Sequence, residues 1–333
     1  MLDSAFQQLA NKLTDYPRTV FFILLCSCLF PAIGAESVVI PVPDYRPPET
    51  VQRVVVPAVP SDTASRVLIV TGESSYEHDW TGVNTRLRSL MLETGVLDVR
   101  VIEDPRVLTL DMLNRYDAVF VNYLGRWNYT DAIEARWGSV AEQALFDYAK
   151  NGGGVVLYHA SLNMGSPGWP EFEQLAGGTM RPHQGSRRSP PDAFLVNITD
   201  HEHPVTQGMR DYVWTMNDDM YTNMYWHPNA KIRVLATAFD DPALYSQTIA
   251  GPKYPAHLYT PEKLAAMQAM AADNPQVWTV EYGKGRVFCI ALGHGPDTLL
   301  HDGVKSLILR GMQWAATGSV TIPLGAKARA FNQ

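Results

Sequence analysis

The sequence predicts an α/β fold with a mostly parallel sheet, and three observations support this prediction. Apolar runs rich in β-branched residues, of which residues 67–71 are the clearest, are typical of strands buried on both faces. Segments with the apolar spacing of a helix lie between these runs. Strands that alternate with helices in this way form parallel sheets with right-handed crossovers.

The first half of the chain gives the clearest order of elements. We expect strands at residues 67–71, 97–102, 116–122 and 155–158, with helices at residues 81–94 and 132–150. The second half is less regular. There we expect strands at residues 194–198 and 233–238, a short helix at residues 261–272, a hairpin of residues 277–282 and 287–292, and a closing helix at residues 298–316.

The N-terminus has the features of a secretory signal peptide, which we place at residues 1–35. Basic residues precede an apolar run at residues 20–30, and Ile33-Gly34-Ala35 provides a cleavage site. The run is shorter than the ~20 residues that a membrane-spanning helix needs. An uncleaved anchor, a cytosolic extension and a lipoprotein signal at Cys26 or Cys28 stay open as alternatives. We therefore expect an exported bacterial protein, periplasmic or extracellular, without membrane contact after cleavage.

Three further segments follow the signal peptide. Residues 36–65 are rich in proline and predict an extended tether or a strap over the domain. Residues 66–324 form the main domain, and residues 325–333 form a C-terminal tail. Signal cleavage leaves Cys289 as the remaining cysteine, so no intramolecular disulfide is expected. The net charge of −7 does not favour nucleic acid or an anionic membrane surface as a partner.

Two predicted strands end at a histidine. Residues 155–158 run directly into His159, and the run that ends at Gly293 is followed by His294. Because ligands of open α/β sheets bind at the carboxyl ends of the strands, both histidines are candidate site residues. His159 stands at the turn where many α/β enzymes carry a serine or cysteine nucleophile. Acyl transfer through a covalent thioester or ester is therefore disfavoured, and metal binding or acid–base chemistry is favoured.

Two more histidines, His78 and His183, lie in loops that we expect near these strand ends. Together with His159 and His294 they could hold a divalent metal such as zinc. The sequence has no metal-ligand spacing motif, so a hydrogen-bonding or packing role for each histidine stays open. The glycines at 152–154 precede a strand instead of following it, and we expect no nucleotide cofactor.

An acidic pair and several aromatic residues complete the predicted site. The pair Asp218-Asp219 suits acid–base work, although it also suits a turn with capping acids. The candidate catalytic residues are His159, His294 and Asp219. The candidate substrate contacts are Trp80, Asn122 and Tyr221.

Several short motifs of glycine, histidine, aspartate and aromatic residues occur along the chain. They are His78-Asp79-Trp80, Gly152-Gly153-Gly154 with His159, His183-Gln184-Gly185, Asp200-His201-Glu202-His203-Pro204, Asp218-Asp219-Met220-Tyr221, Gly283-Lys284-Gly285, Gly293-His294 and Trp314-Ala315-Ala316-Thr317-Gly318. From about Arg66 to Leu324 the chain thereby resembles the ThuA-like family (trehalose-utilisation protein A). The resemblance implies a flavodoxin-like three-layer α/β/α sandwich, similar to class I glutamine amidotransferases. It also implies that His159 occupies the place of their cysteine, so glutaminase activity is not expected.

The resemblance also implies a metabolic context. The family is linked to sugar metabolism, in particular to trehalose and related disaccharides, so a small-molecule sugar is the expected partner. The favoured hypothesis is an exported sugar-processing enzyme, a hydrolase, lyase or isomerase, that uses a metal or histidine acid–base chemistry. The alternative is a non-catalytic carbohydrate-binding protein with the same fold. Whether the chain forms a homo-oligomer stays open.

Overall fold

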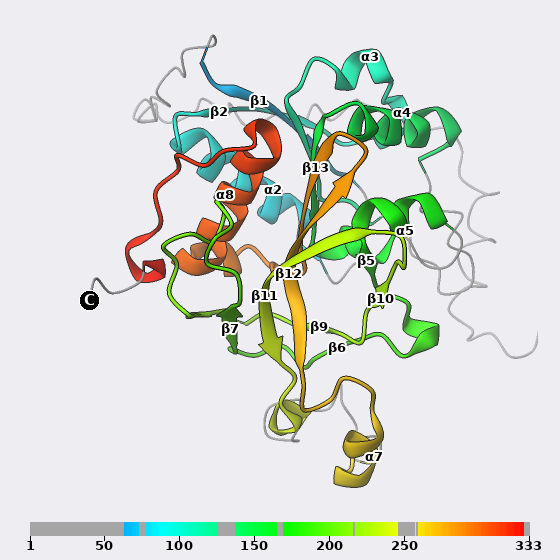
Figure 1. The fold of residues 1–333 in the computed structure, drawn as a ribbon, viewed down its shortest axis with the longest axis vertical. Coiled ribbons are helices and arrows are strands. Elements are labelled where there is room, and N and C mark those ends of the chain that lie inside the picture. The colour runs from blue at the N-terminus through cyan, green and yellow to red at the C-terminus, as the bar shows by residue number, and fades with distance from the viewer. Residues whose placement is uncertain are drawn as a thin grey trace, which may run out of the picture. The chain divides into compact units, whose positions relative to one another are not determined.

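The computed structural model describes residues 63–72, 78–124, 137–164, 169–215, 217–245, 257 and 259–329. The predicted signal peptide and residues 36–62 of the proline-rich segment lie outside these residues. Within the described ranges, nine strands form one sheet in the order β2-β1-β3-β4-β13-β12-β11-β7-β8 (Figure 1). No helix in these ranges is long and apolar enough to cross a membrane.

Five neighbouring strands form the parallel half of the sheet. They are β2 (Leu97–Ile102), β1 (Ser65–Val70), β3 (Ala118–Val121), β4 (Gly154–Tyr158) and β13 (Gly285–Ile290). Every residue of β3 and β4 is buried, as expected for central strands covered on both faces. The chain order of the strands reverses around β1, which lies between β2 and β3. Ligands of open α/β sheets bind at the carboxyl edge beside such a reversal.

Four antiparallel strands extend the sheet beyond β13. They are β12 (Asp273–Tyr282), β11 (Lys231–Phe239), β7 (Leu195–Ile198) and β8 (Tyr212–Trp214). The predicted hairpin is the pair β12 and β13, in which Tyr282 lies opposite Gly285. Strand β13 therefore joins the two halves, because it is parallel to β4 and antiparallel to β12.

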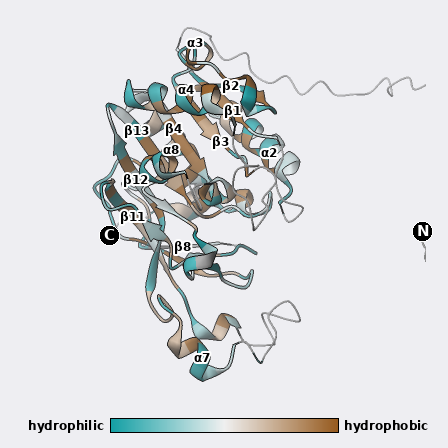
Figure 2. Ribbon diagram, turned by 90° about the vertical axis from the view of Figure 1, so that its right-hand side faces the viewer, coloured by the Kyte–Doolittle hydropathy of each residue, from teal (hydrophilic) through white to brown (hydrophobic). Residues whose placement is uncertain are grey.

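Helices cover both faces of the sheet (Figure 1). One face carries α2 (Trp80–Glu93) and α8 (Asp302–Thr317), and the other carries α3 (Leu110–Leu113), α4 (Ser139–Lys150) and α5 (Pro170–Ala176). Apolar residues of α2 at helical spacing, such as Val83, Leu87 and Met91, pack against the sheet. Figure 2 shows hydrophobic residues concentrated on strands such as β3 and β4. The predicted three-layer sandwich is confirmed.

Three helices differ in length from the prediction. The short helix α7 (Pro261–Ala266) ends early because Met267 is extended, and the positive φ angles of Ala269 and Ala271 then prevent a right-handed helix from continuing. The closing helix is divided into a 3₁₀ turn, η8 (Thr298–Leu300), and α8, because His301 is extended and its Nδ1 caps α8. The helix predicted from residue 132 begins only at Ser139, because Gly138 has a φ of 89° that no right-handed helix allows, and residues 132–136 lie outside the described residues.

Two small antiparallel ladders accompany the main sheet. They pair β5 (Gly178–Thr179) with β10 (Tyr225–Trp226) and β6 (Arg187–Arg188) with β9 (Tyr221–Thr222). Strands of two residues have no detectable periodicity, so the sequence did not predict them. The second ladder sets Arg188 opposite Tyr221 and brings both toward the carboxyl edge of the parallel strands.

Candidate functional site

Three histidines from distant parts of the chain meet at the carboxyl edge of the parallel strands. His78 lies just before α2, His159 begins a 3₁₀ turn directly after β4, and His294 follows β13. The ring centroids of His78 and His294 are 4.7 Å apart, and that of His159 is 5.3 Å from each. The adjacent parallel pairing of β4 and β13 explains why His159 and His294 emerge side by side.

His159 has an unusual backbone conformation and a defined ring orientation. Its φ of 40° lies in the left-handed region, which is costly for a residue with a Cβ. A sharp turn after a central strand is also how nucleophile elbows present their side chain. Nδ1 of His159 lies 2.6 Å from the carbonyl oxygen of Ala291, so Nδ1 carries a proton and donates it. In the neutral ring Nε2 is then an acceptor that faces the site.

Asp219 lies between two of the histidines. Its Oδ1 is 3.6 Å from Nε2 of His159, and its Oδ2 is 3.4 Å from Nδ1 of His294. The side chains of His159 and Asp219 are only 1% and 3% exposed. Neither Nε2 of His159 nor Oδ1 of Asp219 has a hydrogen-bond partner among the described residues. Two buried acceptors that face each other are unfavourable unless a proton or a metal cation lies between them.

The surroundings shift the pKa values of the two histidines in opposite directions. Burial lowers the pKa of His159 well below its usual value, because an imidazolium there would lose its hydration. Burial acts in the same direction on His294, but the adjacent Asp219 carboxylate outweighs it and raises the pKa of His294. Burial alone would raise the pKa of Asp219, yet His294, with Arg188 at 3.4 Å, holds it at about 2. The site therefore combines a neutral His159 with an ion pair of His294 and Asp219.

Asp218 fixes the loop that carries His294. Its carboxylate accepts backbone N–H bonds from Gly293 at 2.9 Å, from His294 at 3.0 Å and from Asp219 at 3.0 Å. Burial, followed by the charge of Asp219, raises the pKa of Asp218 to about 7. The hydroxyl of Tyr158 donates to the carbonyl of Gly293 at 2.6 Å, and a Cβ at Gly293 would lie 2.1 Å from that hydroxyl. Only glycine fits this contact.

The donor atoms of the site suit a divalent metal. One group consists of His78, His159 and His294, and a second consists of His159, Asp218 and Asp219. Within each group the donor atoms lie within 4.8 Å of one another. Imidazole nitrogens with a carboxylate are ligands that zinc and related ions prefer. A ligand histidine usually donates its second N–H to a carbonyl, as His159 does to Ala291.

The other residues predicted from the sequence occupy different places. Trp80 is partly buried and begins α2. Tyr221 is fully buried, and its ring centroid lies 4.8 Å from that of His159. The side chain of His183 lies outside the described part of the structure. Contacts of Trp80 and Tyr221 with a substrate, and metal binding by His183, stay predictions.

A buried amide network supports the edge of the site next to β3. Nδ2 of Asn122 donates to Oδ1 of Asn84 at 2.8 Å, and Nδ2 of Asn84 donates to Oγ1 of Thr71 at 2.6 Å. The sequence reading missed Asn84, although a polar residue beside Val83 and Leu87 on the apolar face of a helix is a usable signal. Asn122 as a substrate contact stays a prediction.

Two described residues near His159 that could act as nucleophiles are not accessible. Cys289 is fully buried in β13, and burial raises the pKa of its thiol. Ser161, two residues after His159, is also fully buried. Neither side chain can reach a substrate carbonyl, so the described part of the site offers no thiolate or alkoxide for the chemistry of a glutaminase.

The fold and the site define an α/β protein with a histidine–aspartate cluster at the carboxyl edge of its parallel strands. The family model for ThuA, described as trehalose utilisation, matches residues 66–315. The chain belongs to the ThuA family.

Solved structures of ThuA-like proteins are similar to this chain. One from Parabacteroides merdae ATCC 43184 has a TM-score of 0.59 and 24% identity, and the match covers 80% of this chain and 95% of that one. One from Bacteroides uniformis ATCC 8492 has a TM-score of 0.55 and 18% identity, with 78% and 94% covered. These likenesses confirm the expected flavodoxin-like fold. Among curated proteins the chain has no match.

Proposed function

We propose that the chain is a sugar-processing enzyme that uses a divalent cation held by His78, His159, His294 and Asp219. The observation that supports this most is the buried contact between His159 and Asp219. Their facing acceptor atoms are 3.6 Å apart and have no hydrogen-bond partner within the described ranges. A cation between them would remove the repulsion and satisfy both atoms.

The surrounding residues would each have a definite task. A bound divalent ion supplies a Lewis acid that polarises a sugar carbonyl or lowers the pKa of a water molecule. The carbonyl of Ala291 keeps Nε2 of His159 directed at the site. Asp218 holds His294 in place through its three backbone N–H bonds. Arg188 limits the negative charge of Asp219.

A second candidate is acid–base catalysis without a metal. The ion pair of His294 and Asp219 favours it, because the carboxylate of Asp219 raises the pKa of His294 and so stabilises its imidazolium form. His294 would then donate a proton to a leaving oxygen, while the neutral His159 would accept one. Both candidates use the same side chains, so only the cation distinguishes them.

The sugar substrate and the location outside the cytoplasm are separate parts of the proposal. Membership of a family described as trehalose utilisation supports a sugar as the substrate. Export depends on the signal-like N-terminus, which lies outside the described residues. The non-catalytic carbohydrate-binding protein remains the alternative for the same fold.

Metal analysis of purified protein and of variants tests the cation. We expect about one equivalent of divalent metal per chain. The affinity for this metal should fall at least tenfold in His159→Ala and in Asp219→Asn. His201→Ala is the matched control, because His201 is exposed and pairs with Asp211 at 3.2 Å. A metal-free protein whose His159→Ala variant still binds trehalose would refute the proposal and support the carbohydrate-binding alternative. Trehalose turnover that resists EDTA and is lost in His294→Ala would instead support acid–base catalysis.

A further inference from the structure

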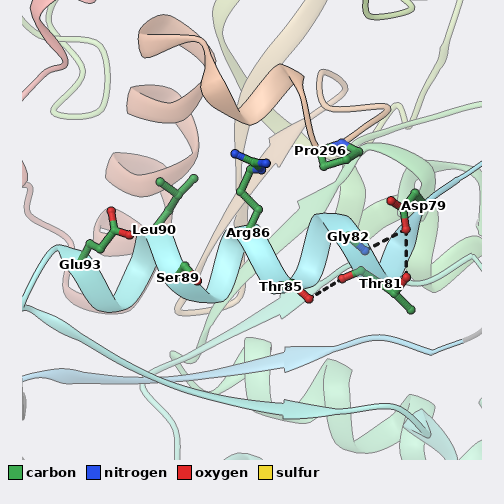
Figure 3. A pocket seen from close by; sticks show the side chains of 9 residues that line it. All are labelled: Asp79, Thr81, Gly82, Thr85, Arg86, Ser89, Leu90, Glu93 and Pro296. Carbon is green, nitrogen blue, oxygen red and sulfur yellow. Dashed lines mark hydrogen bonds between the residues drawn. The ribbon is translucent and has the colours of Figure 1, made fainter. Parts of the chain in front are cut away.

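A cleft of about 640 Å³ lies along α2 (Figure 3). Figure 3 shows Asp79 and Pro296 at one end of this row of residues and Glu93 at the other. Asp79 directly follows His78, and Pro296 is two residues from His294. The cleft therefore opens next to the candidate site and has the volume for a sugar-sized ligand.

Arg86 is the positively charged residue that lines the cleft, and it has no hydrogen-bond or ion-pair partner among the residues that the structure describes. Its side chain is partly buried, and its Nε is fully buried without a hydrogen bond to any residue that the structure describes. Figure 3 shows its guanidinium rising from α2 on the side of the helix where Pro296 lies. Asp79 and Glu93 line the same cleft, yet no described carboxylate lies within ion-pair distance of Arg86. A planar guanidinium in this state is suited to bind an oxyanion through two parallel hydrogen bonds.

A row of hydroxyl groups lies along the same helix. Thr81, Thr85 and Ser89 line the cleft at four-residue intervals, which places them on one face of α2. Oγ1 of Thr81 donates to Asp79, and Oγ1 of Thr85 donates to the carbonyl of Thr81. The lone pairs of both oxygens stay available to accept hydrogen bonds from ligand hydroxyls.

The charges of the cleft select among anions. One guanidinium and the two carboxylates of Asp79 and Glu93 leave the lining with an excess negative charge. A dianionic phosphate would be repelled by both ends of the cleft, whereas a single carboxylate can pair with Arg86 at lower cost. Hydroxyl groups on the carbon chain that bears this carboxylate would donate hydrogen bonds to the threonine oxygens and to Glu93.

We infer that the cleft binds a sugar acid, a polyhydroxylated monocarboxylate whose carboxylate pairs with Arg86. Its hydroxyls bind the face formed by Thr81, Thr85 and Ser89. The inference deepens the proposed function and rests on it only for the reaction, which would occur at the histidine cluster. Binding itself needs no metal.

Calorimetric titration of the full chain with matched ligands tests the inference. D-gluconate and D-glucitol differ only in a carboxylate that replaces a CH₂OH group, and gluconate should bind at least tenfold tighter. Arg86→Gln should weaken gluconate binding at least tenfold and leave glucitol binding unchanged. Arg88→Gln is the control, because Arg88 is exposed on the same helix and does not line the cleft. Arg86→Lys keeps the positive charge but removes the planar guanidinium that can donate two parallel hydrogen bonds. We therefore expect an intermediate loss of gluconate affinity.

The titration also separates this inference from the metal proposal. Gluconate chelates divalent ions, so the protein is measured both as purified and after dialysis against EDTA. Binding that survives EDTA and is kept in His159→Ala supports the cleft even if no metal is found. Equal affinity for gluconate and glucitol, no effect of Arg86→Gln in a variant with unchanged melting, or tighter binding of D-glucitol 6-phosphate than of gluconate would each overturn the inference.

Discussion

At the residue scale, the backbone of His159 stores strain that two substitutions can measure. His159→Gly and His159→Ala both remove the imidazole, but only glycine accepts a φ of 40° without a steric penalty. We expect the glycine variant to be the more stable by about 1 kcal/mol in urea unfolding. His294 has no positive φ, so the same pair of substitutions there should favour alanine. An alanine variant at 159 as stable as the glycine variant would show that the strain is absent.

His203 makes stability depend on pH. Burial, followed by the charge of Arg233, lowers its pKa to about 4, and its Nδ1 accepts the N–H of Val205 at 3.2 Å. Between pH 6.5 and 4 the unfolded chain binds a proton that the folded chain does not, so this contribution is complete above pH 6.5 and lost on acidification. The free energy of unfolding should fall by up to about 3 kcal/mol as the pH is lowered.

Unfolding of wild type and His203→Asn at pH 7 and pH 5 measures this contribution. The amide oxygen of asparagine can accept the same N–H without titrating, so the variant should lose less stability on acidification. His201→Asn, at an exposed histidine, should follow the wild type. Parallel pH dependence of wild type and His203→Asn would rule out His203 as the source.

At the element scale, α8 is tied to the rest of the domain by a buried arginine. Arg310 is 8% exposed, and its guanidinium donates to the carbonyls of Pro204, Val205, Gln207 and Ile322. Arg310→Met would leave these carbonyls without their donor and should destabilise the protein by about 3 kcal/mol in urea unfolding. Lys305→Met on the same helix removes only an ion pair with Asp302 and should cost less than about 1 kcal/mol. Equal effects of the two substitutions would contradict a special role for Arg310.

At the scale of the whole molecule, the parallel half of the sheet could be predicted from the sequence. Continuous apolar runs, such as residues 67–71, identify strands that helices cover on both faces. The ladders of two residues, including the one that contains Arg188, have too little sequence for any periodicity. The early end of α7 depends on the extended backbone of Met267 and on the positive φ angles of Ala269 and Ala271, which these residue types do not predict.

The candidate site was predictable only where it follows from topology. His159 and His294 could be placed together because parallel strands end at one edge of a sheet. The contact of Asp219 with both histidines depends on how the loop between β8 and β9 folds back, which no local pattern encodes. The position of Asn84 on the apolar face of α2 is a signal that the sequence carries, but its pairing with Asn122 follows only from the tertiary structure.

The position of β13 next to β4 has a consequence for the newly made chain. The residues at the ends of these strands, His159 and Ala291, are separated by 132 positions in the sequence. At ~5–20 residues per second a ribosome needs roughly 7–26 s to synthesise that stretch. During this time β4 has no neighbour on one side, and an unpaired strand edge can pair with other chains. We therefore expect the nascent chain to aggregate more readily than the folded protein and to benefit from a chaperone.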